Sequence, residues 1–149
     1  MKFDHLEAVD IIARELEKYE LDVQVTHDKS MDIDIIASLL NETVLKVIVR
    51  YVSPTSQYTF VSQDNFDVND NQLFIAVLYD SGPATREVYL LPASTWGQRV
   101  EHFTTKNYDK PGQKSKPEYG INFSGKTIED ISSYRLPFYL NQMVRDANK

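Results

Sequence analysis

Met31 to Val52 reads MDIDIIASLLNETVLKVIVRYV, and this stretch decides the fold because two runs of alternating side chains flank a short polar segment. In a β-strand, residues two positions apart lie on the same face of the sheet. The odd positions of both runs are mostly apolar: Ile33, Ile35, Ala37 and Leu39, then Leu45, Val47, Val49 and Tyr51. The stretch therefore predicts two antiparallel strands, with acids entering the first and a cation late on the second.

The turn between these strands sets which side chains lie opposite each other. A three-residue turn, Asn41-Glu42-Thr43, pairs Leu40 with Val44 and therefore Asp34 with Arg50. In the same register Ile36 lies opposite Ile48, and Ser38 opposite Lys46. Cβ atoms of directly opposed residues lie about 4.5–5.5 Å apart, so we expect an ion pair between Asp34 and Arg50.

Size and composition indicate an ordinary globular protein. The 149 residues predict one domain over 1–149, and 42% hydrophobic with 26% charged residues is typical of soluble proteins. Apolar runs fall short of the ~20 residues that span a bilayer, and the N-terminus does not read as an export signal. No membrane partner and a cytoplasmic location are expected. Absence of cysteine excludes disulfides, thiolate nucleophiles and thiolate metal sites.

The net charge of −6 and a pI near 5.0 argue against a broadly basic nucleic-acid-binding surface. One segment, 106–116, is nevertheless locally basic. It contains one acid, Asp109, and four lysines, which are Lys106, Lys110, Lys114 and Lys116. Short clusters of like charge are usually solvated loops, and this is one interpretation. The other is a mobile arm that contacts phosphates.

Further elements follow from periodicity and turn residues. Asp4 to Tyr19 has apolar residues at helical spacing, with Asp4 and Glu7 in the positions of a capping box. Four more segments have strand character: Leu21–Thr26, the fully apolar Leu73–Tyr79, Glu87–Leu91 antiparallel to it, and a short edge strand at Tyr119–Phe123.

The C-terminal segment Thr127–Met143 predicts a helix that Pro137 breaks or kinks. The tail from Val144 is expected to fray. The histidines lack zinc-binding spacing. Four tyrosines within predicted elements are interpreted as packing residues rather than as stacking platforms for nucleic acid: Tyr79, Tyr89, Tyr119 and Tyr134.

In this order the elements resemble the PD-(D/E)xK nuclease superfamily, whose fold is restriction-endonuclease-like. The resemblance is closest to small bacterial members with a D-x-D-hydrophobic strand followed by an I-Q-V-K strand. The corresponding segments here are Asp32–Ala37 and Val47–Arg50, and further similarity lies in Leu73–Tyr79, Tyr89–Pro92 and Glu118–Asn122. The resemblance implies an α/β fold with a central mixed β-sheet of four or five strands, flanked by the first and the C-terminal helices.

The resemblance also implies a degenerate catalytic site. In active relatives, two strand acids bind Mg²⁺, a nearby lysine positions or activates water, and a glutamate of the first helix assists. Asp34 matches the first acid, Arg50 matches the lysine, and Glu7 lies in the region of the helix glutamate. Ile48 stands at the second acid and supplies no oxygen ligand. Arginine stays protonated, so Arg50 cannot act as a base.

Three functions remain open at this point. The first is a nuclease-like domain that lost metal-dependent hydrolysis, needs no cofactor, and binds a partner. That partner is nucleic acid, through the Arg50 face and the 106–116 arm, or another protein. The second is a divergent Mg²⁺-dependent nuclease that uses Asp34, Glu7 and a migrated acid. The third is a self-associating or immunity-type interaction protein, such as a homodimer, in which the nuclease resemblance is architectural. Asp34, Arg50 and Glu7 also have purely structural interpretations. Asp34 and Arg50 would form an ion pair, and Glu7 would cap the first helix.

Overall fold

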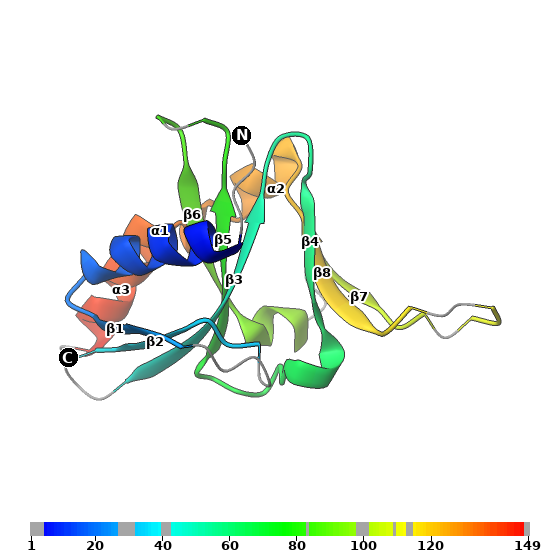
Figure 1. Cartoon of the computed structure of the whole chain (residues 1–149), viewed down its shortest axis with the longest axis horizontal. Helices are drawn as coiled ribbons and strands as arrows, with labels where there is room; N and C mark the ends of the chain where they lie inside the picture. The colour runs from blue at the N-terminus through cyan, green and yellow to red at the C-terminus, as the bar shows by residue number, and fades with distance from the viewer. Residues whose placement is uncertain are drawn as a thin grey trace.

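The computed structural model describes residues 5–26, 32–39, 43–82, 84–97, 102–108, 110–112 and 115–147. Its central feature is a five-stranded mixed sheet in the order β1-β2-β3-β5-β6 (Figure 1). Its strands are β1 (Asp22–Val25), β2 (Ile35–Ser38), β3 (Val44–Val52), β5 (Leu73–Tyr79) and β6 (Glu87–Pro92). β3 and β5 run parallel, and the other neighbours are antiparallel. The predicted central mixed sheet is therefore confirmed.

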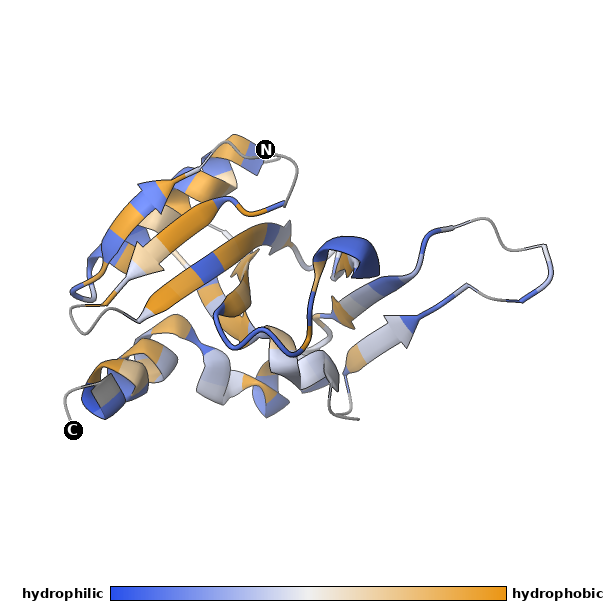
Figure 2. Cartoon of the chain, turned by 90° about the horizontal axis from the view of Figure 1, so that it is seen from below, coloured by the Kyte–Doolittle hydropathy of each residue, from blue (hydrophilic) through white to orange (hydrophobic). Residues whose placement is uncertain are grey.

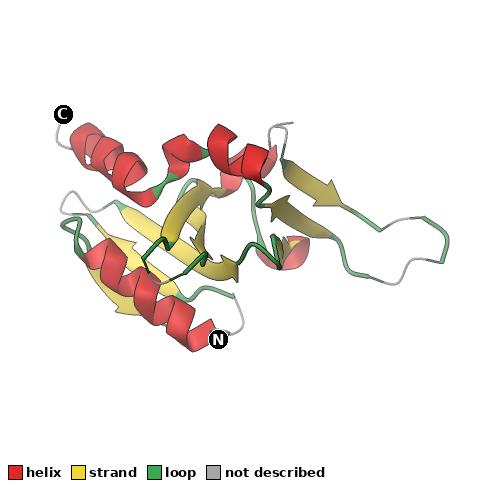
Figure 3. Ribbon diagram, turned by 90° about the horizontal axis from the view of Figure 1, so that it is seen from above, coloured by secondary structure: helices red, strands yellow, loops and turns green. Residues whose placement is uncertain are grey.

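Helices cover one face of this sheet (Figure 3). α1 (His5–Glu17) and α3 (Leu136–Ala147) bury Ile12, Leu16 and Leu140 in the same apolar cluster as Ile35 and other strand residues. Both α1 and α3 carry apolar residues at helical spacing, which forms the stripe that faces the sheet. The predicted positions of the first and C-terminal helices are confirmed.

A second, three-stranded antiparallel sheet packs on the opposite face of the first. Its order is β4-β8-β7, with β4 (Tyr58–Ser62), β8 (Glu118–Asn122) and β7 (Phe103–Lys106). Val61, Phe103 and Ile121 point into the apolar cluster that fills the space between the sheets, together with Ile48 and Ile75. The prediction of an edge strand at Tyr119–Phe123 was wrong, because β8 is the central strand of this second sheet.

β5 has apolar residues on both of its faces, and each face packs against a different apolar cluster. Phe74, Ala76 and Leu78 contact the helix-side cluster, whereas Ile75 and Val77 contact the cluster between the sheets. This confirms a strand buried on both faces, which is why its sequence is continuously apolar. Hydrophobic residues accordingly line the strands of the first sheet (Figure 2).

The C-terminal segment is divided earlier than predicted, because α2 ends at Asp130 and Pro137 begins a helix instead of breaking one. α2 (Gly125–Asp130) and the 3₁₀ turns η2 (Ala93–Gly97) and η3 (Ser132–Tyr134) lie beside the second sheet, and α3 begins at Leu136. Pro137 is the second residue of α3, where its missing N–H leaves no helical hydrogen bond unmade. α3 then continues to Ala147, beyond the predicted start of fraying. Asp4, the predicted helix cap, lies outside the described residues.

The hairpin register differs from the prediction by two residues. Ile36 lies opposite Lys46 and Ser38 opposite Val44, and the Leu39 N–H donates to the Thr43 carbonyl at 2.9 Å. The connection therefore starts one residue earlier than predicted. Moving a turn of unchanged length by one residue displaces the pairing by two, so every side chain keeps its face.

None of the helices within the described segments is long and apolar enough to cross a membrane.

Candidate functional site

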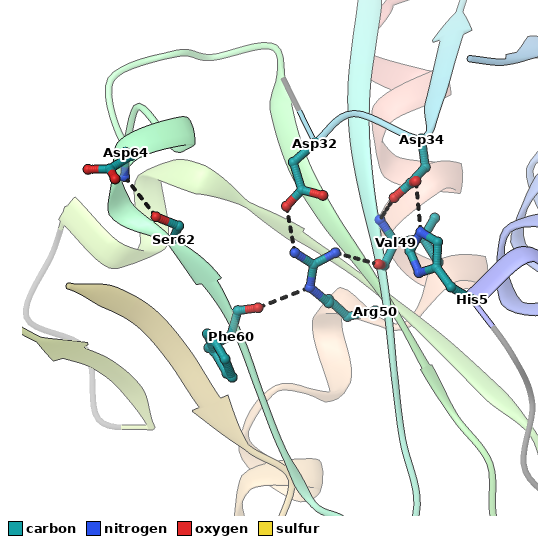
Figure 4. A network of polar contacts seen from close by, with 8 residues as sticks. All are labelled: His5, Asp32, Asp34, Val49, Arg50, Phe60, Ser62 and Asp64. Carbon is teal, nitrogen blue, oxygen red and sulfur yellow. Dashed lines mark hydrogen bonds and ion pairs between the residues drawn. The ribbon is translucent and has the colours of Figure 1, made fainter. Parts of the chain in front are cut away.

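Asp34 lies one residue before β2 and uses its carboxylate to extend the pairing with β3. Its N–H donates to the Val47 carbonyl, and its Oδ2 accepts the Val49 N–H at 2.8 Å. Its Oδ1 lies 2.8 Å from His5 Nε2, at the start of α1 (Figure 4). Both oxygens of Asp34 therefore hold parts of the fold together. Asp34 therefore contacts the residues on either side of Ile48, Val47 through its backbone and Val49 through its carboxylate.

Arg50 lies on β3 and makes three hydrogen bonds through three nitrogens. Nη2 donates to Asp32 Oδ2 at 2.6 Å, Nε to the Phe60 carbonyl at 3.0 Å, and Nη1 to the Val49 carbonyl at 2.8 Å (Figure 4). Phe60 belongs to β4, which is an edge strand of the second sheet. Arg50 thus joins the two sheets and satisfies an acceptor on an exposed edge.

The predicted ion pair between Asp34 and Arg50 was wrong, because the acid that binds Arg50 is Asp32. The two-residue shift in register is the reason, since it brings the residue two positions before Asp34 to the level of Arg50. Asp32 has a φ of 57°, a left-handed conformation that aspartate tolerates better than most residues.

The other two site positions lie as follows. Ile48 is fully buried in the cluster between the sheets. Glu7 lies in the first turn of α1 with its side chain exposed. His5 is a contact of the site that sequence reasoning missed, since an isolated histidine at a helix start carries no signal of its partner.

These residues do not fit a Mg²⁺ site. Mg²⁺ requires oxygen ligands in near-octahedral geometry. Both Asp34 oxygens already accept hydrogen bonds, Ile48 offers no oxygen, and the Arg50 guanidinium places a positive charge on the neighbouring part of β3. Across the described segments, no group of three or more His, Asp or Glu side chains is positioned to hold a metal ion.

A pocket of about 300 Å³ lies near the start of β5. It is lined by Lys46, Asp64, Asp67, Asp70 and Phe66, among others. Lys46 forms an ion pair with Asp70, and this hydrogen bond lowers the pKa of the Asp70 carboxyl. Lys46 is half-buried and is neutralised by Asp70.

The lysine segment forms the connection between β7 and β8. The described part of this connection extends away from both sheets (Figures 1 and 3). Lys106, Lys110 and Lys116 are exposed, and Lys114 lies outside the described residues. Lys106 Nζ lies 4.3 Å from the centroid of the Tyr58 ring, a cation–π distance.

Aromatic residues beside this connection were missed by the sequence reasoning as a surface feature. Tyr58 and Phe60 lie on the outer face of β4, with ring centroids 5.9 Å apart and an interplanar angle of 24°. The alternation of side chains in Tyr58–Ser62 was the available signal. It shows that Tyr58 and Phe60 share a face, but that face can be recognised as the outer one only when the neighbouring strands are known. The four tyrosines interpreted as packing residues are buried or partly buried against the cluster between the sheets: Tyr79, Tyr89, Tyr119 and Tyr134.

Glu118 holds two tyrosine side chains, Tyr58 and Tyr108, in place. Its carboxylate is buried and accepts hydrogen bonds from the Tyr58 hydroxyl and, at 2.8 Å, from the Tyr108 hydroxyl. Burial, and then the bond to Glu118, raise the pKa of Tyr58. The bond to Glu118 likewise raises the pKa of Tyr108. Both tyrosines therefore remain protonated donors over the ordinary pH range.

Comparison with known proteins bears on the fold. Neither a protein-family model nor a curated protein matches the chain. Among solved structures, the chain is similar to Hjc, a Holliday junction resolvase from the archaeal hyperthermophile Archaeoglobus fulgidus. The TM-score is 0.51 at 12% sequence identity, over 79% of this chain and 83% of that chain. At this identity the likeness concerns the fold alone, and it confirms the prediction that the chain has a restriction-endonuclease-like α/β fold.

Proposed function

We propose that this chain is a nuclease-fold protein that does not hydrolyse phosphodiesters by a metal-dependent mechanism and acts by binding nucleic acid. The observation that carries the proposal is the state of the degenerate site. Asp34 is bound by His5 and the Val49 N–H, the adjacent Ile48 is buried, and Arg50 replaces the lysine. A guanidinium stays protonated and cannot take a proton from water.

Nucleic acid is the favoured partner because exposed lysines concentrate on one projecting segment of an acidic chain. Lys106, Lys110 and Lys116 are exposed there, whereas the chain as a whole carries a net charge of −6. Phosphates would then bind at this segment, and the rest of the surface would repel them. The structural neighbour, a Holliday junction resolvase, supports the same class of partner.

Arg50 is not part of the proposed phosphate-binding surface. The guanidinium already donates to Asp32 and to the carbonyls of Val49 and Phe60. A phosphate would have to replace these partners, which also join the two sheets. Nucleic acid would therefore bind at the lysine segment and not at the Arg50 face.

Binding can be tested by fluorescence anisotropy with labelled single-stranded, duplex and four-way-junction DNA in EDTA, over a series of salt concentrations. The test variant replaces Lys110, Lys114 and Lys116 with alanine. Each lost phosphate contact should lower the slope of log K against log salt by about 0.7–0.9. We expect the triple variant to lose affinity for every DNA that wild type binds, with a shallower slope.

The matched control removes three cations on or directly after the helices of the opposite face: Arg14, Lys18 and Arg145. It should bind as wild type does. Absence of salt-dependent binding by wild type would refute the proposal. If light scattering then showed a stable dimer, the self-associating interaction protein would be favoured.

Loss of catalysis is tested separately by plasmid nicking in Mg²⁺ and in Mn²⁺. We expect wild type and Asp34→Asn to give the same background, because the site does not fit the metal. Asparagine retains an acceptor for the Val49 N–H, and a thermal melt checks that the variant is folded. Cleavage by wild type that Asp34→Asn abolishes would establish the active nuclease instead.

A further inference from the structure

Phe60 is a large apolar side chain on the outer face of the second sheet, and it is 50% exposed. It lies on β4, which pairs with β8 on one side and is the sheet edge on the other. Its ring lies nearly parallel to that of Tyr58, its neighbour two residues away. One aromatic ring supported by a second, with a free face toward solvent, is the geometry that stacks an unpaired base.

Tyr58, which stacks against Phe60, is held in place by its surroundings. Gly120, across the strand pair from Phe60, has no Cβ, and an added Cβ would lie 2.1 Å from the Tyr58 hydroxyl oxygen. The ring of Tyr58 therefore lies directly over the β8 backbone, and its hydroxyl is bound by Glu118. A platform that is ordered before binding loses little side-chain entropy when a ligand arrives.

Charge on this face favours an anionic ligand. Lys106 lies over the Tyr58 ring, so an ammonium lies on the same aromatic face as Phe60. The acid of this face, Glu118, is buried and covered by two phenol hydroxyls. The connection with Lys110 and Lys116 begins directly after Lys106. A phosphate backbone could thus run along the lysines while a base contacts Phe60.

We propose that the outer face of the second sheet binds single-stranded nucleic acid, with a base stacked on Phe60 and the backbone beside Lys106, Lys110 and Lys116. This inference rests on the proposed nucleic-acid-binding function and specifies its ligand and its contact residue. Single strands are required because a base inside a duplex has no free face for an aromatic ring. The chemistry is shared by DNA and RNA.

The test uses the full chain and anisotropy with four labelled probes of equal length: oligo-dT, oligo-U, an abasic strand and a duplex. Phe60→Ala should bind oligo-dT or oligo-U about 5- to 150-fold more weakly, the range for loss of one stacked base. Its affinity for the abasic strand should stay at the wild-type value. Phe60→Trp should retain the affinity, and its tryptophan fluorescence should be quenched on binding, since the one native tryptophan, Trp96, is buried.

Phe138→Ala is the matched control, because Phe138 is 59% exposed and lies on α3, on the other side of the five-stranded sheet. It should leave binding unchanged. Preference for DNA or RNA is read from the two homopolymers.

The outcomes separate this inference from the proposed function. If wild type binds none of the probes, both fail. If wild type binds and the triple lysine variant weakens binding, but Phe60→Ala does not, the stacking inference fails and the proposed function stands. Equal affinity of wild type for the abasic strand and for oligo-dT would also overturn the inference. Selective loss in Phe60→Ala, with Phe138→Ala unaffected, supports it.

Discussion

Arg50 and Asp32 form an ion pair across the start of the hairpin, with Nη2 2.6 Å from Oδ2. The same guanidinium donates to the Phe60 carbonyl of β4, so one side chain joins the entrance to β2, the middle of the first sheet and the edge of the second. The sequence resemblance predicts that Arg50 stands at the position of a catalytic lysine. Here the cation holds the structure together.

A double-mutant cycle can measure this pair. The Arg50 and Asp32 side chains are 22% and 36% exposed, so solvent partly screens them. We expect a coupling of about 0.5–1 kcal/mol between Asp32→Ala and Arg50→Ala in urea unfolding. The cycle with Asp34→Ala in place of Asp32→Ala should give a smaller coupling. A larger coupling of Arg50 with Asp34 than with Asp32 would contradict the observed register.

Restoring an acid at position 48 should damage the fold without creating a nuclease. Ile48 is fully buried between the sheets, so Ile48→Glu places a carboxyl among apolar side chains. We expect a loss of about 3–5 kcal/mol in the free energy of unfolding. Ile36→Glu is the matched control, because Ile36 is exposed and lies opposite Lys46. The control should stay within about 0.5 kcal/mol of wild type in the same urea titration. A stable Ile48→Glu protein that cleaves DNA with Mn²⁺ would refute both this packing and the proposed function.

Acid should weaken the Lys46–Asp70 pair. The hydrogen bond from Lys46 holds the pKa of Asp70 below its ordinary value of 3.8, so the folded state favours the ionised carboxyl. The resulting stabilisation is complete above the pKa of the unfolded chain. It is lost as the pH falls from there through the lowered pKa of the folded state. Asp70→Asn should therefore be less stable than wild type at pH 7, and the difference should shrink below pH 3.8.

Thermal melts at a series of pH values measure this difference. Lys46→Met removes the hydrogen-bond donor of Asp70 and should abolish the same part of the pH dependence. A wild-type advantage over Asp70→Asn that grows on acidification would show that the carboxyl is not stabilised in its ionised form.

A methyl group at Gly120 should disturb the aromatic face. The added Cβ would meet the Tyr58 ring and hydroxyl at 2.1–2.8 Å, so the ring must move away from Glu118. We expect Gly120→Ala to lower the free energy of unfolding by about 1–3 kcal/mol. Gly125→Ala is the control, since no atom lies within 4 Å of its added Cβ. Combining Gly120→Ala with Tyr58→Ala should give less than the sum of the two losses, because the clash is then absent. Full additivity in urea unfolding would argue against the contact.

The first sheet could be predicted because its strands carry their own signals. β2 and β3 alternate, and β5 is apolar throughout because both of its faces are covered. The exact pairing could not be predicted. Shifting the turn by one residue leaves every side chain on the same face, so the pattern allows either Asp32 or Asp34 as the partner of Arg50. The β2–β3 pairs and the closing contact from Leu39 to Thr43 distinguish the two registers in the structure.

The second sheet lacked such a signal, because its strands are short and depend on one another. β4 lies inside the crossover between β3 and β5, and β8 is central only once β4 and β7 flank it. A tertiary contact also orients β8, since Trp96 Nε1 donates to the Gly120 carbonyl at 2.9 Å. The exposed aromatic pair and the buried Glu118 follow from this arrangement, so they could not be recognised from the sequence.

The pairing of β4 with β8 also sets an order of assembly during synthesis. Tyr58 and Glu118 are 60 positions apart in the chain, whereas the first three strands of the larger sheet follow one another closely. β4 therefore leaves the ribosome long before its partner and must wait with an unmatched edge until β8 emerges. Truncated nascent chains that end before residue 118 should show this segment as the part most easily captured by a chaperone.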